Sequence, residues 1–198
     1  YFEVLTALAF LEFAETKVDI AVLEVGMGGR FDATNVVRPL VSVITTIAKD
    51  HEKHLGSSLE KIAFEKSGII KPGVPVVCGV RGGAALRRIR RIAREREAPL
   101  IEVFDPERTL EARPARRGFR FVYAGERGRY AFSPSLAGRH QGQNAAVAIA
   151  TAEVLSRTWK PLDKTRIDRA IRETRWEGRL ETVSRRPPVL LDGAHNVE

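Results

Sequence analysis

The chain has 198 residues, of which 43% are hydrophobic and 29% are charged, a composition typical of a globular protein rather than a disordered one. Its length allows one sizeable core and part of a second domain, and its one cysteine, Cys78, excludes an internal disulfide and fits a reducing compartment. No apolar run approaches the ~20 residues of a membrane-spanning helix, so we expect a cytoplasmic protein with no membrane partner.

The net charge of +8 raises the question of an acidic partner, either a nucleic acid or a small molecule. Much of this charge lies in residues 81–96, which hold seven arginines and one acid, Glu95. Leu86, Ile89 and Ile92 recur there at helical spacing, so the arginines occupy the other face of an amphipathic helix. A solvated helix face accounts for the charge without a nucleic-acid partner, because neither zinc-ligand spacing nor an aromatic platform accompanies it.

Apolar periodicity predicts alternating strands and helices before Asp105. Ser57 and Glu60 form a capping-box pair that marks the start of one helix. The expected helices cover residues 1–15, 57–70 and 81–96, and the expected strands cover residues 20–25, 40–48, 75–80 and 100–104. This alternation predicts an α/β fold with a mostly parallel sheet and helices on both of its faces.

The pattern changes after Asp105, where short alternating stretches such as FRFVY are separated by GERG. They predict antiparallel hairpins at a sheet edge over residues 109–136. Two helices are expected next, over 144–155 and 163–174, and the VLLD stretch after the basic break at 185–188 is expected to be a strand. The expected domains are a central one, residues 1–182, and the first strand of a truncated C-terminal α/β domain, residues 183–198.

The stretch VLEVGMGGRFDATN, residues 22–35, organises the chain. An apolar run that contains Glu24 leads into a glycine-rich turn and then into a polar stretch. A carboxylate in a buried strand must be neutralised, hydrogen-bonded or bound to a cation, and glycines suit a backbone that turns sharply or passes close to a ligand. The stretch therefore predicts a buried strand that delivers a carboxylate to a site under a loop. A strand whose acid pairs with an arginine, followed by an ordinary turn, stays open.

Polar side chains follow the predicted strands at their carboxyl ends, where open parallel sheets bind ligands. Glu24 lies near the end of the first strand, Asp50 and His51 end the second, and Lys66 lies on the helix that follows. A carboxylate and an imidazole on neighbouring strands can ligate a divalent cation, and a carboxylate-rich site favours Mg²⁺ or Mn²⁺ over zinc. The structural alternatives are a strand cap for His51 and a surface position for Lys66.

Six blocks of sequence carry a resemblance to a known family. They read EVGMGGRFDATN, DH, LGSSLEKIAFEKSGIIKPG, GRHQGQNAAVAIA, WEGRLE and LLDGAHN, in this order, between residues 20 and 196. Together they resemble the folylpolyglutamate synthase and dihydrofolate synthase family of the Mur ligase superfamily. The resemblance implies the central ATPase domain of a Mur ligase, truncated at its N-terminus.

The same resemblance implies an ATP-dependent amide ligase that adds L-glutamate to dihydropteroate, to folate polyglutamate or to both. In such enzymes the substrate carboxylate takes the γ-phosphate of ATP to become an acyl phosphate, and the amine of glutamate then displaces phosphate. Magnesium neutralises phosphate charge in this chemistry, so the resemblance implies that Glu24, His51 and Lys66 hold Mg²⁺, with Lys66 carbamylated. The implied partners are small molecules, namely ATP, L-glutamate and dihydropteroate or a reduced folate, and the complete enzyme is expected to be monomeric.

Further residues match the family's nucleotide and substrate contacts. Asn144 resembles the asparagine that contacts adenine, and Arg179 resembles the arginine that reaches the ATP phosphates. Asp192 and His195 resemble residues that face the nucleotide from the second domain. The residues implied to lie near the acceptor substrate or the metal are Asp32, Thr34 and Asn35. The structural alternatives are a helix cap for Asn144, a surface ion pair for Arg179 and a turn for Asp192 and His195.

The chain departs from the family pattern because it contains no G-x-x-G-K-[ST] phosphate loop. We therefore expect an internal piece of a longer ligase that is inactive alone. A Mur-type peptidoglycan amino-acid ligase stays open as an alternative with the same fold and chemistry, although FEKSGIIKPG and DGAHN favour the folate branch. A basic α/β module that binds nucleic acid or phosphate in a salt-sensitive way is the more remote alternative.

Overall fold

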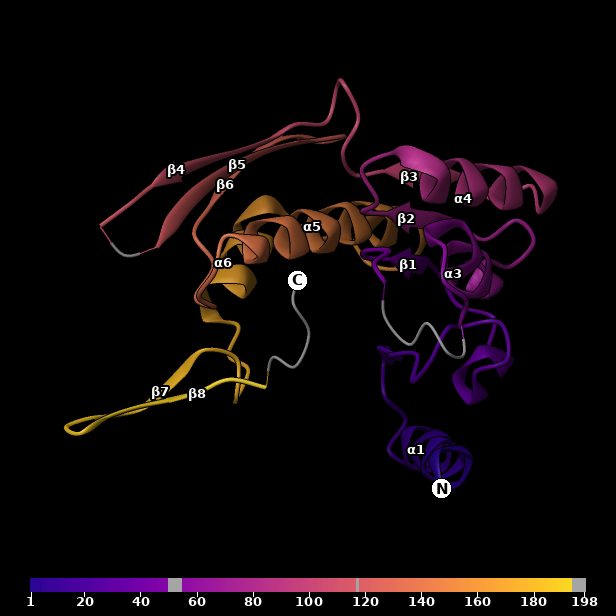
Figure 1. Cartoon of the computed structure of the whole chain (residues 1–198), viewed down its shortest axis with the longest axis horizontal. Coiled ribbons are helices and arrows are strands. Elements are labelled where there is room, and N and C mark those ends of the chain that lie inside the picture. The colour runs from indigo at the N-terminus through magenta and orange to yellow at the C-terminus, as the bar shows by residue number, and fades with distance from the viewer. Residues whose placement is uncertain (50–54, 117, 194–198) are drawn as a thin grey trace. The chain divides into compact units, whose positions relative to one another are not determined.

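A computed structural model describes the chain over residues 1–49, 55–116 and 118–193. The fold consists of two compact units. The first combines Tyr1–Val76 with Gly82–Pro99, and the second combines Val77–Arg81 with the chain from Leu100 onward. Figure 1 shows the helices and strands of both. In the described ranges, no helix combines the length and the apolar character that a membrane crossing requires.

Three short strands form a sheet of order β1-β2-β3. Their bounds are Ser42–Ile44 for β1, Val76–Cys78 for β2 and Leu100–Glu102 for β3. The Val76 N–H donates to the Pro99 carbonyl at 2.8 Å, and the Val103 N–H donates to the Cys78 carbonyl at 2.9 Å. The bonds advance along β2 and β3 in the same direction, as in a parallel ladder. The predicted parallel sheet is confirmed, with shorter strands than the pattern indicated, and the Cys78 side chain is fully buried in β2.

Helix α4 (Gly83–Glu95) is the arginine-rich helix, and its predicted amphipathic character is confirmed. One stripe is buried and consists of Ala85, Leu86, Ile89, Ile92 and Ala93. The large apolar side chains in such a stripe each contribute about 1.5–3 kcal/mol by leaving water. Exposed arginines cover the opposite face, where Arg91 pairs with Glu95 at 3.3 Å. The sequence therefore places most of its local charge on a solvated face.

Helix α3 (Leu59–Lys66) packs against α4. Its N-cap is Ser58, whose hydroxyl accepts a hydrogen bond from the Lys61 N–H at 3.2 Å. The prediction of Ser57 as the cap was wrong by one residue. Both serines are favoured cap residues, but only Ser57 has a glutamate three positions later, and the structure does not use that capping box. The helix ends at Lys66 and continues into the 3-10 turn η2 (Ser67–Ile69).

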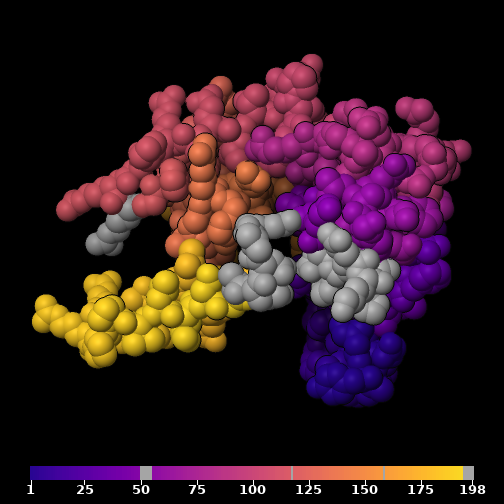
Figure 2. Space-filling view, viewed as in Figure 1, coloured from indigo at the N-terminus to yellow at the C-terminus, as the bar shows by residue number. Residues whose placement is uncertain are grey.

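Helix α1 (Phe2–Glu15) confirms the first predicted helix. Apolar side chains lie all around it, and many are exposed. The most exposed of them are Tyr1 (93%, at its N-cap), Val4 (62%), Leu11 (59%) and Leu8 (55%). Figure 2 shows α1 in indigo with much of its surface uncovered. In the described structure α1 therefore has no buried apolar stripe, and Thr6 is its one buried residue.

The predicted strand over residues 20–25 was wrong. The segment has no regular structure, Val22 is 91% exposed, and Glu24 is exposed as well. A strand requires a neighbour that takes its N–H and C=O groups, and no described strand pairs with this segment. The apolar run alone therefore does not form a strand. The carboxylate of Glu24, which was expected to be buried, is in contact with solvent.

A second sheet lies in the second unit, in the order β4-β5-β6. Its strands are β4 (Leu110–Pro114), β5 (Phe119–Gly125) and β6 (Gly128–Phe132), and both pairings are antiparallel. These are the predicted hairpins, which form a sheet of their own. Phe121 pairs with Phe132, and Tyr123 pairs with Tyr130, so four aromatic residues share one buried face. That face supplies enough apolar area for a separate sheet.

Two helices complete the core of the second unit. Helix α5 (His140–Thr158) packs on β4 and β5, and α6 (Lys164–Glu173) packs on β6. A side chain at Gly142 of α5 would place its Cβ 2.1 Å from the Phe121 ring, so glycine allows the helix to approach the sheet. Both predicted helices are confirmed, and α5 begins one turn earlier than expected.

The described C-terminal part is a hairpin of β7 (Glu181–Arg185) and β8 (Pro188–Leu191). Strand β8 confirms the predicted VLLD strand. Its partner β7 was not predicted, because ETVSR carries only a weak strand pattern. The hairpin is closed further by the Gly193 N–H, which donates to the Gly178 carbonyl at 2.7 Å. The proposed domain boundary between residues 182 and 183 stays a prediction.

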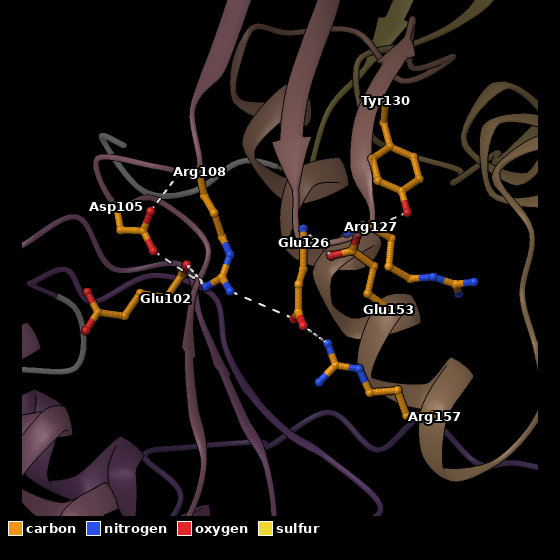
Figure 3. A network of polar contacts seen from close by, with 8 residues as sticks. All are labelled: Glu102, Asp105, Arg108, Glu126, Arg127, Tyr130, Glu153 and Arg157. Atoms are coloured by element: carbon orange, nitrogen blue, oxygen red, sulfur yellow. Dashed lines mark hydrogen bonds and ion pairs between the residues drawn. The ribbon is translucent and has the colours of Figure 1, made fainter.

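A buried carboxylate fastens the β5–β6 turn to helix α5 (Figure 3). Glu153 is 3% exposed and accepts hydrogen bonds from the N–H groups of Glu126 (3.1 Å) and Arg127 (2.8 Å). The Tyr130 hydroxyl donates to it at 3.0 Å. Burial first, and then the charge and hydrogen bond of Glu153, raise the pKa of Tyr130 to about 12. Three neutral donors thus satisfy one buried charge, which would otherwise destabilise the fold.

A chain of ion pairs continues outward from the same turn (Figure 3). The Glu126 carboxylate pairs with Arg157 of α5 and with Arg108 at 3.8 Å. Arg108 also pairs with Asp105 at 3.5 Å and donates to the Glu102 carbonyl at 3.0 Å. The turn is therefore held from both sides, by Glu153 within the core and by arginines at its rim.

Candidate active site

The glycine-rich loop, residues 26–35, lies directly against the C-terminal end of helix α3. Gly28 and Gly29 have φ values of +67° and +153°, in the region that favours glycine. A Cβ on Gly29 would lie 3.0 Å from the Lys66 carbonyl oxygen and 3.1 Å from that of Glu65. The loop backbone can approach the last turn of α3 this closely because side chains are absent there.

Asp32 gives the loop its internal shape. Its carboxylate accepts hydrogen bonds from the Met27 N–H at 2.9 Å, the Thr34 N–H at 3.0 Å and the Thr34 hydroxyl at 2.6 Å. It thereby caps the 3-10 turn η1 (Ala33–Val36). Burial alone would raise the pKa of Asp32, but the hydrogen bonds from Thr34, Met27 and Gly26 outweigh burial, and the pKa lies below its ordinary value of 3.8. The hydrogen bonds of the loop therefore favour the anionic form of Asp32.

An ion pair joins the loop to α3 from the side. Arg30 donates from Nε to Glu65 Oε2 at 3.1 Å and from Nη2 to Glu65 Oε1 at 2.9 Å. The Arg30 N–H also donates to the Glu65 carbonyl at 2.9 Å. This two-pronged geometry is the arrangement that the planar guanidinium favours. Neither residue was singled out from the sequence, where they are 35 positions apart.

The far end of the loop is tied to the chain that follows α3. Asn35 donates from Nδ2 to the carbonyls of Arg30 (3.1 Å) and Gly68 (3.2 Å). Lys71 donates from Nζ to the Asn35 carbonyl at 2.6 Å. Burial, and then the charge of Arg96, lower the pKa of Lys71. The side chains of Asp32, Thr34 and Asn35 thus have partners within the first unit.

The structure describes two of the three residues of the predicted metal trio. Lys66 is the last residue of α3, half-buried, with its carbonyl beside the glycine loop. Glu24 precedes the loop and is exposed, and His51 lies outside the described residues. Within the described ranges, no group of three or more His, Cys, Asp and Glu side chains is placed to hold a metal. Lysine belongs to none of these residue types, so the trio itself stays a prediction.

The predicted nucleotide residues lie in the second unit. Asn144 is exposed in the second turn of α5 and donates from Nδ2 to Gln141 Oε1 at 3.1 Å, so it is not a helix cap. Arg179 is exposed before β7, and Asp192 is exposed just after β8. His195 lies outside the described residues. Their predicted contacts with a nucleotide stay predictions.

Comparison with known proteins identifies the family. The model of the Mur ligase middle domain matches residues 2–152. The chain is 45% identical to the dihydrofolate synthase/folylpolyglutamate synthase of Bacillus subtilis (strain 168), over 100% of this chain and 46% of that protein. It is 40% identical to the folylpolyglutamate synthase of Lacticaseibacillus casei, over 98% of this chain and 46% of that protein. The chain thus spans about half the length of the curated relatives it matches.

Solved structures agree with the sequence comparison. The apo form of L. casei folylpolyglutamate synthase matches with a TM-score of 0.90 and 38% identity, over 98% of this chain and 48% of that one. A complex of a folylpolyglutamate synthase with AMPPCP and folate matches with a TM-score of 0.88 and 38% identity, over 97% of this chain and 47% of that one. The chain therefore belongs to the Mur ligase family through its middle domain, within the branch of the folylpolyglutamate and dihydrofolate synthases.

Proposed function

We propose that this chain is the central part of an ATP-dependent ligase that joins L-glutamate to the carboxyl group of dihydropteroate, of a folate or of both. The observation that carries the proposal is the likeness, along the whole chain, to synthases that are named for this reaction. The docked glycine loop gives it a structural basis, because the loop and Lys66 occupy one end of one helix. A Mur-type peptidoglycan ligase is not favoured by any of these relatives.

The proposed reaction has two steps. An oxygen of the substrate carboxylate attacks the γ-phosphorus of ATP, the bond to ADP breaks, and an acyl phosphate forms. The amine of glutamate then attacks the acyl carbon, loses a proton, and the C–O bond to phosphate breaks to leave an amide. Catalysis in such transfers depends on positioning and on neutralising phosphate charge.

In this proposal Glu24, His51 and Lys66 hold Mg²⁺, which would supply that neutralising charge. The two of these residues that the structure describes fit the role. The Glu24 carboxylate is exposed, and carboxylate oxygens are ligands that Mg²⁺ prefers. Lys66 is only half-buried, and carbamylation of its amine would convert a cation into a further oxygen ligand. Mn²⁺ has similar ligand preferences and is expected to substitute.

The remaining site residues are assigned in the same proposal. Asn144 contacts the adenine ring and Arg179 the phosphates of ATP, and both are exposed. Asp192 and His195 contact the nucleotide from the C-terminal side of the chain. The hydrogen bonds of Asp32, Thr34 and Asn35 support a role in shaping the loop against which the acceptor substrate lies.

The test uses the full-length product of the gene that encodes this chain. ADP release is measured in the presence of Mg²⁺ with one acceptor at a time, which is dihydropteroate, tetrahydrofolate or a UDP-linked muramoyl acceptor. Each acceptor is assayed with L-glutamate and without it. We expect glutamate-dependent turnover with at least one pterin, and the active pterin identifies the step performed. Turnover with the muramoyl acceptor alone would overturn the proposal in favour of the peptidoglycan branch.

A second measurement tests the metal assignment. We expect Glu24→Gln and His51→Ala each to weaken Mg²⁺ binding by at least about 10- to 100-fold, since removing even a hydrogen-bond partner of a metal ligand has an effect of that size. A carbon-13 signal from labelled bicarbonate that disappears in Lys66→Arg would identify the carbamate. Glu111→Gln, an exposed acid on β4 that pairs with Arg113 and Arg129, is the matched control and should bind Mg²⁺ as the unaltered protein does.

A further inference from the structure

Arg30 is held through its backbone as well as through its side chain. Its N–H donates to the Glu65 carbonyl at 2.9 Å, and its own carbonyl accepts from Asn35 Nδ2 at 3.1 Å. Its guanidinium donates twice to the Glu65 carboxylate. Gly68 lies against its backbone, because a Cβ there would be 2.3 Å from the Arg30 Cα. One residue thus concentrates the contacts between the glycine loop and the end of α3.

Aromatic rings fix the orientation of this guanidinium. Its carbon lies 4.2 Å from the centroid of the Phe31 ring and 4.8 Å from that of Phe64, a residue of α3. Guanidinium groups stack on such faces, whereas an ammonium group is a point charge without a plane. The planar shape of arginine therefore suits this site. A lysine would retain the charge but lose both the paired hydrogen bonds to Glu65 and the stacking on the rings.

Exposure argues that this arrangement serves more than stability. The side chains of Arg30 and Glu65 are 39% and 21% exposed. Ion pairs with this much contact with water usually contribute little to the stability of a fold, and more where the geometry is two-pronged, as it is here. The carboxylate partner, however, is the residue immediately before Lys66. A pair that adds little to stability can still fix geometry, and misplacing a reacting group by about 1 Å can slow catalysis by about 100-fold.

We propose that Arg30 is a positioning residue which, together with Glu65, locks the glycine loop onto the end of helix α3 and so sets the place of Lys66 relative to Asp32. The inference rests on the proposed function, since it gives the two residues a task in the same ligase site. Arg30 acts through Glu65 and the loop backbone and touches no reacting atom.

The experiment compares five variants of the full-length enzyme, of which Arg30→Glu alone is the reference for the charge exchange. Arg30→Gln removes the positive charge, and Arg30→Lys retains it without the paired hydrogen bonds to Glu65. The double exchange of Arg30→Glu with Glu65→Arg restores an ion pair with the charges reversed. Arg91→Gln is the matched control, because Arg91 forms an exposed ion pair with Glu95 on α4. Steady-state kinetics give kcat and the KM for ATP, and amide hydrogen exchange reports the opening of the loop.

We expect Arg30→Gln to lower kcat by about 10- to 100-fold, with the KM for ATP and the urea midpoint unchanged and with faster amide exchange confined to residues 26–35. Arg30→Lys should lose most of the same activity, and the exchanged pair should recover activity relative to Arg30→Glu alone. Arg91→Gln should behave as the unaltered enzyme in every measurement.

Two results would overturn the inference. One is an Arg30→Gln enzyme with normal kcat and normal amide exchange. The other is an activity loss in both Arg30→Gln and Arg30→Lys that merely follows a loss of folded protein. If the unaltered enzyme shows no glutamate-dependent turnover with any pterin, the proposed function fails instead, while the amide exchange still reports whether Arg30 locks the loop.

Discussion

Two glutamates fasten loops to helices in this molecule, and they do so by opposite means. Glu153 is 3% exposed and binds two backbone N–H groups and a tyrosine hydroxyl. Glu65 is 21% exposed at its side chain and binds the guanidinium of Arg30. A buried carboxylate with only neutral donors is costly to disturb, because its donors lose their partners inside the protein. A half-exposed ion pair leaves its members in water, so its loss alters geometry more than stability.

The largest effect should follow from breaking the buried contact. Glu153→Ala leaves the N–H groups of Glu126 and Arg127 and the Tyr130 hydroxyl without their acceptor, and it opens a cavity. We expect a loss of about 3 kcal/mol of unfolding free energy, measured by urea denaturation. Glu111→Gln, which removes an exposed acid on β4, should change stability by less than about 0.5 kcal/mol. Equal losses of unfolding free energy in Glu153→Ala and Glu111→Gln would contradict the claim that the buried contact stabilises the fold more than an exposed one.

Alkaline pH tests the same contact without a mutation. Burial and Glu153 raise the pKa of Tyr130 from 10.0 to about 12, so the folded protein retains this proton more tightly than the unfolded chain does. The contribution is complete below pH 10 and is lost as the pH rises toward 12, by at most about 1.4 kcal/mol for each pH unit. Stability curves of the protein and of Tyr130→Phe measure it. The same decline above pH 10 in both proteins would contradict the assignment.

A substitution of Gly68 tests the close packing of the glycine loop. A Cβ at Gly68 would lie 2.3 Å from the Arg30 Cα, so Gly68→Ala must displace the loop. Overpacking of this kind costs about 1–3 kcal/mol, and we expect about 2 kcal/mol in urea denaturation. Gly73→Ala is the control, because its Cβ would meet no atom within 4 Å and only the backbone conformation, with φ at +69°, is strained. A larger loss in Gly73→Ala would mean that the loop yields easily.

The smallest effect concerns acid pH in the loop. Hydrogen bonds outweigh burial to lower the pKa of Asp32, so its contribution is present above its ordinary value of 3.8 and is lost as the pH falls through the lowered value. Because the Asp32 side chain stays partly exposed, we expect less than about 1 kcal/mol. The amide proton shifts of Met27 and Thr34 follow the titration in NMR spectra, and Asp32→Asn should abolish their response. A midpoint at or above 3.8 would contradict it.

Much of the fold could be predicted from the sequence because its signals are local. The stripe of Leu86, Ile89 and Ile92 determines a helix from within its own sequence, and the alternating FRFVY strand pairs with β4 and β6, which are its neighbours along the chain. The run at residues 20–25 is equally apolar, but a strand depends on a partner elsewhere in the chain, which a local pattern does not specify. Strand β7 is the reverse case, because its own sequence pattern is weak and its pairing with β8 makes it a strand.

The site divides in the same way. The glycines and Asp32 could be identified as a loop because turn chemistry is local, and the resemblance drew attention to Lys66. That the loop lies on the end of α3 depends on contacts between residues far apart in sequence, such as Arg30 with Glu65 and Asn35 with Gly68. No periodicity marks such pairs. The GGR and FEK strings contain Arg30 and Glu65, but the contact between these two residues appears only in three dimensions.

The burial of Cys78 has a practical consequence. It carries the one thiol of the chain, and its side chain is fully enclosed in strand β2. An alkylating reagent reacts only with a thiol that it can reach, so each labelled molecule records an excursion in which this strand has opened. At high reagent concentration the labelling rate equals the opening rate, and at low concentration it gives the opening equilibrium. The natural thiol of Cys78 therefore reports the rate and the equilibrium of sheet opening without an engineered probe.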